Sequence, residues 1–157
     1  MLFRSGNLGY FLLGMIIEKV SGKRYGEFLR ERIFHPLGMN ATTMQDLWKV
    51  TKNRAAGYTL RKGELSHIWY SVAQIELSSA YGLLSTWRDL VKWDAALSGE
   101  KILKKSSLDV VWTPVKLNNG FHHNYGFGWF LDEFRGHRVA AHGGSTEIGR
   151  ASCRERV

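Results

Sequence analysis

Apolar residues recur at helical spacing in the first third of the chain. Four aliphatic side chains repeat three and four positions apart: Leu13, Ile16, Ile17 and Val20. Gly22 follows them as a stop signal, so the pattern predicts a helix over residues 8–21. A second helix is predicted over residues 24–33, and His35-Pro36 ends it because the residue before a proline disfavours the α conformation.

Helical spacing returns in the second half of the chain. Ser85-Thr86 predicts the start of a helix that Gly99 ends, with tryptophans and leucines at helical spacing between them. Asp89 follows Thr86 by three positions, which resembles a capping box with aspartate in place of the usual glutamate. A shorter helix is predicted over residues 106–112, where a proline stops it two positions later.

Strand signals surround and follow this helical region. Residues 57–60 and 65–68 flank a polar turn and predict a hairpin. Glycine alternates with aromatic residues over 125–131, which predicts a strand with one bare face that another element can approach closely. The chain then turns at Arg135-Gly136 and returns over residues 137–142. Helices dominate first and an antiparallel hairpin comes last, so the predicted fold class is α+β.

Composition narrows the class of protein. The chain has 157 residues, 44% hydrophobic and 23% charged, which is typical of a globular domain. The formal net charge is +8, but two cations stand side by side at only three places: Lys23-Arg24, Arg61-Lys62 and Lys104-Lys105. Such scattered charge is typical of a solvated basic surface, so we expect no nucleic-acid partner, with a nucleic-acid-binding surface as the alternative.

The character of the chain changes after Thr146. Residues 147–157 read EIGRASCRERV, without a hydrophobic period and with the only cysteine, Cys153. This run is similar to the translation of a common short-read sequencing adapter. We therefore expect residues 1–146 to be the C-terminal portion of a larger domain and residues 147–157 to be a non-native tail, which is left out of the fold prediction.

The apolar run near the N-terminus and the histidine and cysteine content show whether a transmembrane segment or a metal site is expected. The apolar run over residues 10–17 is shorter than the roughly 20 residues that span a bilayer, and glycines interrupt it, so no transmembrane segment is expected. No histidine pair has the spacing of a metal-binding helix, and residues 1–146 contain no cysteine. We therefore expect no metal and no cofactor.

Two places could carry chemistry. His142-Gly143-Gly144-Ser145 stands at the end of a predicted strand, where the glycines remove side chains that would block a substrate and leave N–H groups facing an oxyanion. His142 supplies a polar wall there. An ordinary glycine turn after a strand is the other interpretation. Asn7, before the first helix, either caps that helix or hydrogen-bonds a ligand.

Five motifs along the chain belong together. They are NLGYFLLGMIIEKVSG at 7–22, IFHPLGM at 33–39, GLLSTWRDL at 82–90, YGFGW at 125–129 and HGG at 142–144. In this order they resemble the serine β-lactamase-like hydrolases, which include class C β-lactamases, D-alanyl-D-alanine carboxypeptidases and class VIII-type esterases. The resemblance implies a partial β-lactamase/transpeptidase-like fold, a helical region followed by antiparallel strands of the central sheet.

The resemblance also implies roles for individual residues. The family uses a Ser-x-x-Lys helix, a Tyr-x-Asn element and a triplet containing lysine or histidine on a wall strand. By resemblance, His142 is catalytic and lies with the substrate-binding Gly143 and Gly144 in the wall triplet. The backbone N–H of Ser145 then completes the oxyanion hole, and Asn7 binds the substrate amide. Family members are often exported, which leaves the compartment of this protein open.

The chain departs from the family at two elements. Ser5 stands at the tyrosine position, and no Tyr-x-Asn occurs. The one Ser-x-x-Lys, Ser98-Gly99-Glu100-Lys101, falls where a helix is predicted to end, so it is not expected to supply the nucleophile. We expect this chain to be an inactive fragment of a serine hydrolase. The full-length hydrolase is expected to form an acyl-enzyme with β-lactam, ester or D-amino-acid peptide substrates.

Two alternatives remain at this point. One is a non-catalytic β-lactamase-like binding protein, which Ser5 favours. The other places the His142 triplet in the oxyanion loop of an α/β-hydrolase, a fold that needs a later G-x-S-x-G motif.

Overall fold

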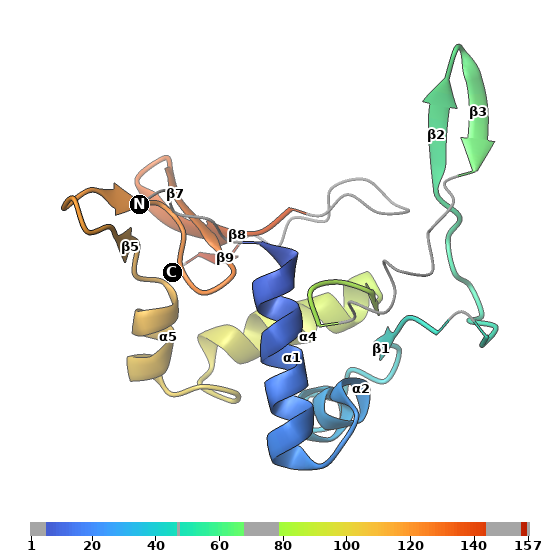
Figure 1. Ribbon diagram of the computed structural model, residues 1–157, viewed down its shortest axis with the longest axis horizontal. Coiled ribbons are helices and arrows are strands. Elements are labelled where there is room, and N and C mark those ends of the chain that lie inside the picture. The colour runs from blue at the N-terminus through green and yellow to red at the C-terminus, as the bar shows by residue number, and fades with distance from the viewer. Residues whose placement is uncertain (1–5, 47, 68–78, 144–154, 157) are drawn as a thin grey trace. The chain divides into compact units, whose positions relative to one another are not determined.

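The computed structural model describes residues 6–46, 48–67, 79–143, 155 and 156 (Figure 1). The chain forms two compact units. The N-terminal unit holds the described residues up to Trp93, and the C-terminal unit holds those from Asp94 onward. Helices and antiparallel strands occur in both, as predicted for an α+β chain.

Two helices open the N-terminal unit. α1 spans Asn7–Ser21 and ends at Gly22, whose φ of 69° lies in the left-handed region that glycine adopts without strain. α2 spans Tyr25–Leu29 and continues into a π-helical turn, η1, at Arg30–Phe34. Both predicted helices are confirmed. The widened last turn was not predicted; it arises where the N–H of His35 reaches back five positions to the carbonyl of Arg30, just before a proline that has no N–H to donate.

The N-termini of α1 and α2 are capped differently from the sequence prediction. The N-cap of α1 is Gly6, and Asn7 is the first helical residue with an exposed side chain, so the prediction that Asn7 caps this helix is wrong. At the start of α2, the carboxylate of Glu18 accepts a 2.7 Å hydrogen bond from the N–H of Tyr25. A side chain of α1 therefore serves the N-terminus of α2, where a negative charge is favourable.

Ser79 approaches the middle of α1 closely. Its hydroxyl donates to the carbonyl oxygens of Tyr10 at 3.0 Å and Phe11 at 3.3 Å. A Cβ atom on Gly14 would lie 2.1 Å from the Ser79 Oγ and 2.2 Å from its Cβ. Glycine is therefore required at this position of the helix because the chain crosses directly over it.

The core of the N-terminal unit lies around η1 and the loop after it. Three buried residues form its centre: Leu29, Phe34 and Met39. Partly buried apolar side chains pack around them: Tyr25, Phe28, Ile33, Leu37, Met44 and Trp93. The IFHPLGM motif thus supplies much of the packing in this unit.

Two antiparallel strand pairs complete the N-terminal unit. β1 (Thr43–Met44) pairs with β4 (Leu83–Leu84), and next to them the N–H of Gln45 donates to the carbonyl of Gly82 at 2.6 Å. β2 (Tyr58–Arg61) and β3 (Glu64–His67) form the predicted hairpin, shown in green in Figure 1. The hairpin is confirmed, whereas two-residue strands such as β1 and β4 are too short for a periodicity to reveal.

The C-terminal unit contains the remaining elements. α4 (Trp87–Ser98) begins before the boundary between the units, and α5 (Lys105–Val111) follows; both helices were predicted. β5 (Val115–Lys116) pairs with β6 (His122–His123). The last sheet has the order β7-β8-β9, all antiparallel, with bounds Phe130–Phe134, His137–Ala141 and Glu155–Arg156.

The strand predicted over residues 125–131 is wrong in its first part. Tyr125 bridges Phe130 as an isolated antiparallel pair, and the residues between them form a tight turn. Gly128 has a φ of 87°, and the N–H of Gly126 donates to the carbonyl of Trp129 at 2.8 Å. The expected close approach is nevertheless real, because a Cβ on Gly126 would lie 2.1 Å from the carbonyl oxygen of Val111.

α1 exposes an unusual amount of apolar surface. Six of its aliphatic side chains are at least half exposed: Leu8, Leu12, Leu13, Met15, Ile16 and Val20. A helix that is apolar around most of its circumference is typical of a protein interior. None of the helices in the described residues combines the length and the apolar character needed to traverse a bilayer.

Candidate active site

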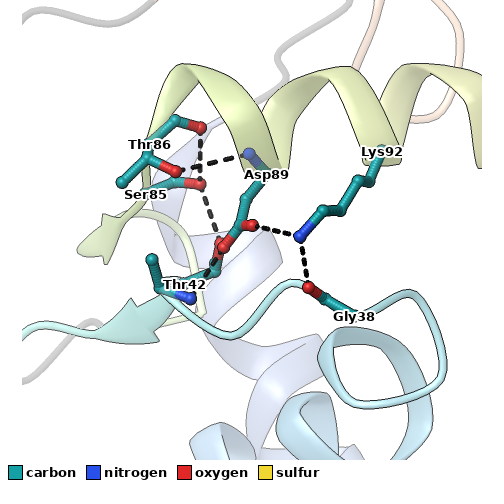
Figure 2. Close-up of polar contacts among 7 residues, drawn as sticks. Gly38, Thr42, Ser85, Thr86, Asp89 and Lys92 are labelled. Carbon is teal, nitrogen blue, oxygen red and sulfur yellow. Dashed lines mark hydrogen bonds and ion pairs between the residues drawn. The ribbon is translucent and has the colours of Figure 1, made fainter.

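Two of the sequence motifs meet at Asp89. Its carboxylate oxygen Oδ2 accepts hydrogen bonds from the N–H of Ala41 at 2.8 Å and the hydroxyl of Thr42 at 2.9 Å, while Lys92 donates to Oδ1 at 2.9 Å (Figure 2). Lys92 also donates to the carbonyl of Gly38. The start of α4 is therefore joined to the loop that follows the IFHPLGM motif.

Hydroxyl groups complete this network. The Thr42 hydroxyl gives its one hydrogen to Asp89, so Ser85, 2.8 Å away, donates to Thr42. The Thr86 hydroxyl accepts a 3.3 Å hydrogen bond from the N–H of Asp89. Half of the predicted capping box is therefore formed, but the aspartate side chain turns to the loop at Ala41 instead of back to the helix start.

Asp89 is buried, with 3% of its surface exposed. Burial by itself raises the pKa of a carboxyl group, but the hydrogen bonds from Lys92, Thr42 and the N–H of Ala41 outweigh it and lower the pKa of Asp89. The charged form is therefore the stable one in the folded unit. Asp89 acts as a structural anchor of the GLLSTWRDL motif, a role that the capping-box interpretation missed.

The end of β8 presents the first two residues of the HGG motif. His142 and Gly143 follow Ala141 directly, and both are exposed. A Cβ on Gly143 would meet no atom within 4 Å, so nothing in the described structure requires glycine there. An open glycine next to an exposed histidine is the arrangement that a substrate lying along a strand edge needs.

Aromatic rings surround His142. Its ring centroid lies 5.4 Å from that of Phe130, with the planes inclined by 32°, and 6.3 Å from that of Tyr125 in an edge-on arrangement. Tyr125 and Phe130 themselves are 5.0 Å apart and nearly perpendicular. The three side chains form one aromatic group in the C-terminal unit. The signal for this group in the sequence is the pair of glycines in YGFGWF, whose alternation with aromatic residues predicts a strand, whereas the structure has a turn there.

The other predicted site residues are placed as follows. Gly144, Ser145 and Ser5 lie outside the described residues. Asn7 belongs to the N-terminal unit and is exposed at the start of α1, whereas His142 and Gly143 belong to the C-terminal unit.

The single Ser-x-x-Lys match has the wrong geometry, as predicted. Ser98 is the last residue of α4, and Glu100 has a φ of 54°, so the chain has left the helix before Lys101. A lysine three positions after a serine lies above it only when both are helical. Ser98-Gly99-Glu100-Lys101 therefore cannot form the serine–lysine pair of the family.

A cavity of about 950 Å³ opens in the N-terminal unit beside α2. Residues 40–46 and 48–52 form much of its wall. Positively and negatively charged residues also line it: Arg24, Arg30, Glu18 and Glu27. Neither Asn7 nor His142 nor Gly143 lines it. The wall of the cavity therefore contains none of the predicted site residues that the structure describes.

Comparison with known proteins gives one consistent answer. The sequence profile described as Beta-lactamase matches residues 2–153. Penicillin-binding protein 4* of Bacillus subtilis (strain 168) is 34% identical over 152 residues, which cover 88% of this chain and 33% of the relative. The chain spans a third or less of the length of the curated relatives it matches.

Solved structures agree with this assignment. An octameric penicillin-binding protein homologue from Pyrococcus abyssi has a TM-score of 0.76 and 34% identity, covering 92% of this chain and 34% of its own. The D-amino acid amidase of Ochrobactrum anthropi SV3, solved with L-phenylalanine amide, has a TM-score of 0.69 and 27% identity, covering 92% and 43%.

These matches confirm the partial β-lactamase/transpeptidase-like fold and overturn the alternative in which the His142 triplet belongs to an α/β-hydrolase. The chain belongs to the β-lactamase family of serine hydrolases.

Proposed function

We propose that the protein to which this chain belongs is a serine hydrolase that works through an acyl-enzyme, and that His142-Gly143-Gly144 is its wall-strand triplet. The observation that carries the proposal is the exposed His142-Gly143 pair at the end of β8, where no atom of the described residues lies within 4 Å of a Cβ on Gly143. Family membership supports the same chemistry.

The proposed reaction divides the work between this chain and the rest of the protein. A serine hydroxyl of a Ser-x-x-Lys helix outside these residues attacks the substrate carbonyl carbon and loses its proton to a neighbouring base. The tetrahedral oxyanion forms beside the Ser145 N–H. It collapses to the serine ester as the C–N or C–O bond breaks and the protonated base gives its proton to the departing amine or alcohol. Water hydrolyses the resulting ester. In this scheme Asn7 binds the substrate amide and His142 forms the polar wall of the pocket.

The substrates that we propose are β-lactams, esters or D-amino-acid peptides and amides. All three classes pass through the same oxyanion and the same serine ester, so the residues of this chain serve each of them alike. Penicillin-binding proteins and a D-amino acid amidase solved with amino-acid ligands are among the relatives, which supports a small acylating substrate.

We further propose that the 157-residue chain is inactive by itself and that residues 147–157 are not native. Ser5 replaces the tyrosine of the family, and the one Ser-x-x-Lys match lies beyond a helix end. Sequencing the gene across Thr146 tests the second point, because the native reading frame is expected to diverge there from EIGRASCRERV.

A non-catalytic binding protein of the same fold is the second candidate, and Ser5 is the observation that favours it. The experiment is to express the uninterrupted reading frame and the 157-residue chain in parallel. Labelling with a fluorescent penicillin and turnover of nitrocefin, p-nitrophenyl butyrate and a D-phenylalanine anilide are then measured. Activity of the complete protein alone is expected. A complete protein that neither labels nor turns over favours the binder, and turnover by the short chain overturns the proposed inactivity.

A further inference from the structure

The ring of His142 contacts two aromatic residues of the YGFGWF segment, Tyr125 and Phe130. We propose that Tyr125 and Phe130 form an aromatic platform that sets the orientation of the His142 ring toward the substrate. Both are positioning residues, since they act through His142. The inference rests on the proposed function of the His142 triplet.

The turn between the two aromatic residues builds the platform. Gly126 allows the chain to pass against the carbonyl of Val111, which also accepts a 3.1 Å hydrogen bond from the N–H of Phe127. Gly128 supplies the positive φ that closes the turn. Tyr125 and Phe130 are thereby brought opposite each other as an antiparallel bridge, and their rings meet in an edge-to-face arrangement that aromatic pairs prefer.

The sheet then brings His142 to these rings. Phe130 pairs with Ala141 in the register of β7 and β8, so the next residue, His142, leaves the sheet beside it. The Phe130 ring centroid lies 5.4 Å from that of the imidazole, with the two planes inclined by 32°, and the Tyr125 ring meets the imidazole edge-on. Tyr125 is only 5% exposed, which fixes the base of the group, whereas Phe130 is half exposed.

The type of contact matters for function. Within the part of the chain that the structure describes, no residue hydrogen-bonds a ring nitrogen of His142. Ring packing therefore holds the plane of the imidazole through contacts that occupy neither ring nitrogen. A histidine held by hydrogen bonds would have one nitrogen occupied. An exposed histidine without packing would sample several rotamers and broad χ2 angles, which weakens its alignment with a substrate.

Nuclear magnetic resonance on the 157-residue chain tests the platform without reference to activity. The His142 ring protons are assigned with a His142→Gln variant. We expect nuclear Overhauser effects between the rings of Phe130 and His142 in the native chain. We also expect ring-current displacement of the His142 ring protons, because the centroid of the Phe130 ring lies 5.4 Å from that of the imidazole.

Three variants separate positioning from folding. Phe130→Leu is expected to remove the ring-current displacement of His142, whereas Phe130→Tyr retains it. Phe134→Leu is the matched control, because Phe134 lies on the same strand and is 53% exposed against 51% for Phe130. It stands four residues, or about 13 Å, further along β7, and its ring contacts the Arg135 guanidinium. Amide spectra of β7 and β8 report whether each variant is folded.

The outcomes are distinct from those of the activity experiment. A native chain without Phe130–His142 cross-peaks overturns the platform even if every variant is unfolded. So does a folded Phe130→Leu variant whose His142 signals do not move. Neither result affects the acyl-enzyme proposal. Conversely, a complete protein that cannot be acylated overturns the proposed function while the ring contacts stand.

Discussion

The hydroxyl of Thr42 donates a 2.9 Å hydrogen bond to the carboxylate of Asp89, 47 positions further along the chain. This contact joins the loop after the IFHPLGM motif to the first turn of α4. The charge of Asp89 is balanced by Lys92 on the next turn of the same helix. The buried, hydrogen-bonded carboxylate of Asp89 therefore holds the loop at Thr42 against α4, where no long strand pairing joins the two segments.

Replacing Asp89 by asparagine is expected to lower the free energy of unfolding by about 1–3 kcal/mol, because buried donors lose a charged acceptor. The measurement is urea-induced unfolding of the 157-residue chain followed by circular dichroism. Asp109→Asn is the matched control, since Asp109 also pairs with a lysine on its helix but is 56% exposed. Its expected cost is about 0.3–0.5 kcal/mol. Equal effects of the two substitutions would contradict the anchoring role of Asp89.

The same aspartate predicts a pH dependence of stability. The pKa of Asp89 is lower in the folded state, so its contribution is complete above the ordinary aspartate pKa of about 3.9 and is lost as the pH falls toward the folded value. Unfolding free energies measured from pH 7 down to pH 3 should therefore fall less steeply for Asp89→Asn than for the native chain. If the unfolding free energies of both chains fell equally with pH, a group other than Asp89 would be responsible for the loss of stability in acid.

Two glycines of α1 should respond in opposite directions to alanine. Gly14→Ala places a Cβ 2.1 Å from the Ser79 hydroxyl oxygen and is expected to cost about 1–3 kcal/mol of unfolding free energy. Gly9→Ala meets no atom within 4 Å and should stabilise the helix by about 0.5–1 kcal/mol. Thermal unfolding of both variants provides the comparison. Adding Ser79→Gly to Gly14→Ala should recover part of the loss, and no recovery would argue against this crossing.

Alanine substitutions at Gly143 and Gly126 compare a glycine that is proposed to bind substrate with a glycine that the packing of the chain requires. Gly143→Ala meets open space, so the stability of the chain should stay within about 0.5 kcal/mol. In the complete protein, the same methyl group is expected to slow acylation roughly tenfold to a hundredfold, because it displaces the substrate at the strand edge. Stopped-flow acylation by nitrocefin measures this effect. Unchanged acylation by the Gly143→Ala protein would remove Gly143 from the binding site.

The control for this pair is Gly126→Ala. Its Cβ would lie 2.1 Å from the carbonyl oxygen of Val111, a backbone atom that cannot swing away. A loss of about 1–3 kcal/mol in unfolding free energy is expected for the 157-residue chain. A stable Gly126→Ala variant would mean that the turn between Tyr125 and Phe130 is looser than the structure indicates.

Much of the fold followed from local patterns. The helices α1, α4 and α5 and the β2–β3 hairpin were predicted to within a few residues, because each has its own periodicity and its own start or stop signal. The family motifs likewise placed His142 and Gly143 at a strand end, where β8 leaves them.

The errors have a different origin. Whether YGFGW is a strand or a turn depends on Val111, which occupies the space beside Gly126 and lies outside the segment. Asn7 was expected to cap α1, but the helix boundary falls one residue earlier. The role of Asp89 depends on Ala41 and Thr42, distant residues that no local pattern includes. Tertiary partners are therefore involved in the YGFGW turn and in the role of Asp89, whereas the error at Asn7 is a shift of one residue in a helix boundary.

The Gln45–Gly82 hydrogen bond has a consequence for the length of the chain between its partners. Together with the β1–β4 pairing, it brings the two ends of residues 46–81 together. Doubling the length of such a closed loop costs only about 0.6 kcal/mol of chain entropy. A longer or shorter connection after Asp46 is therefore expected to change the stability of this unit little, provided that Ser79 keeps its hydrogen bonds to the carbonyls of Tyr10 and Phe11.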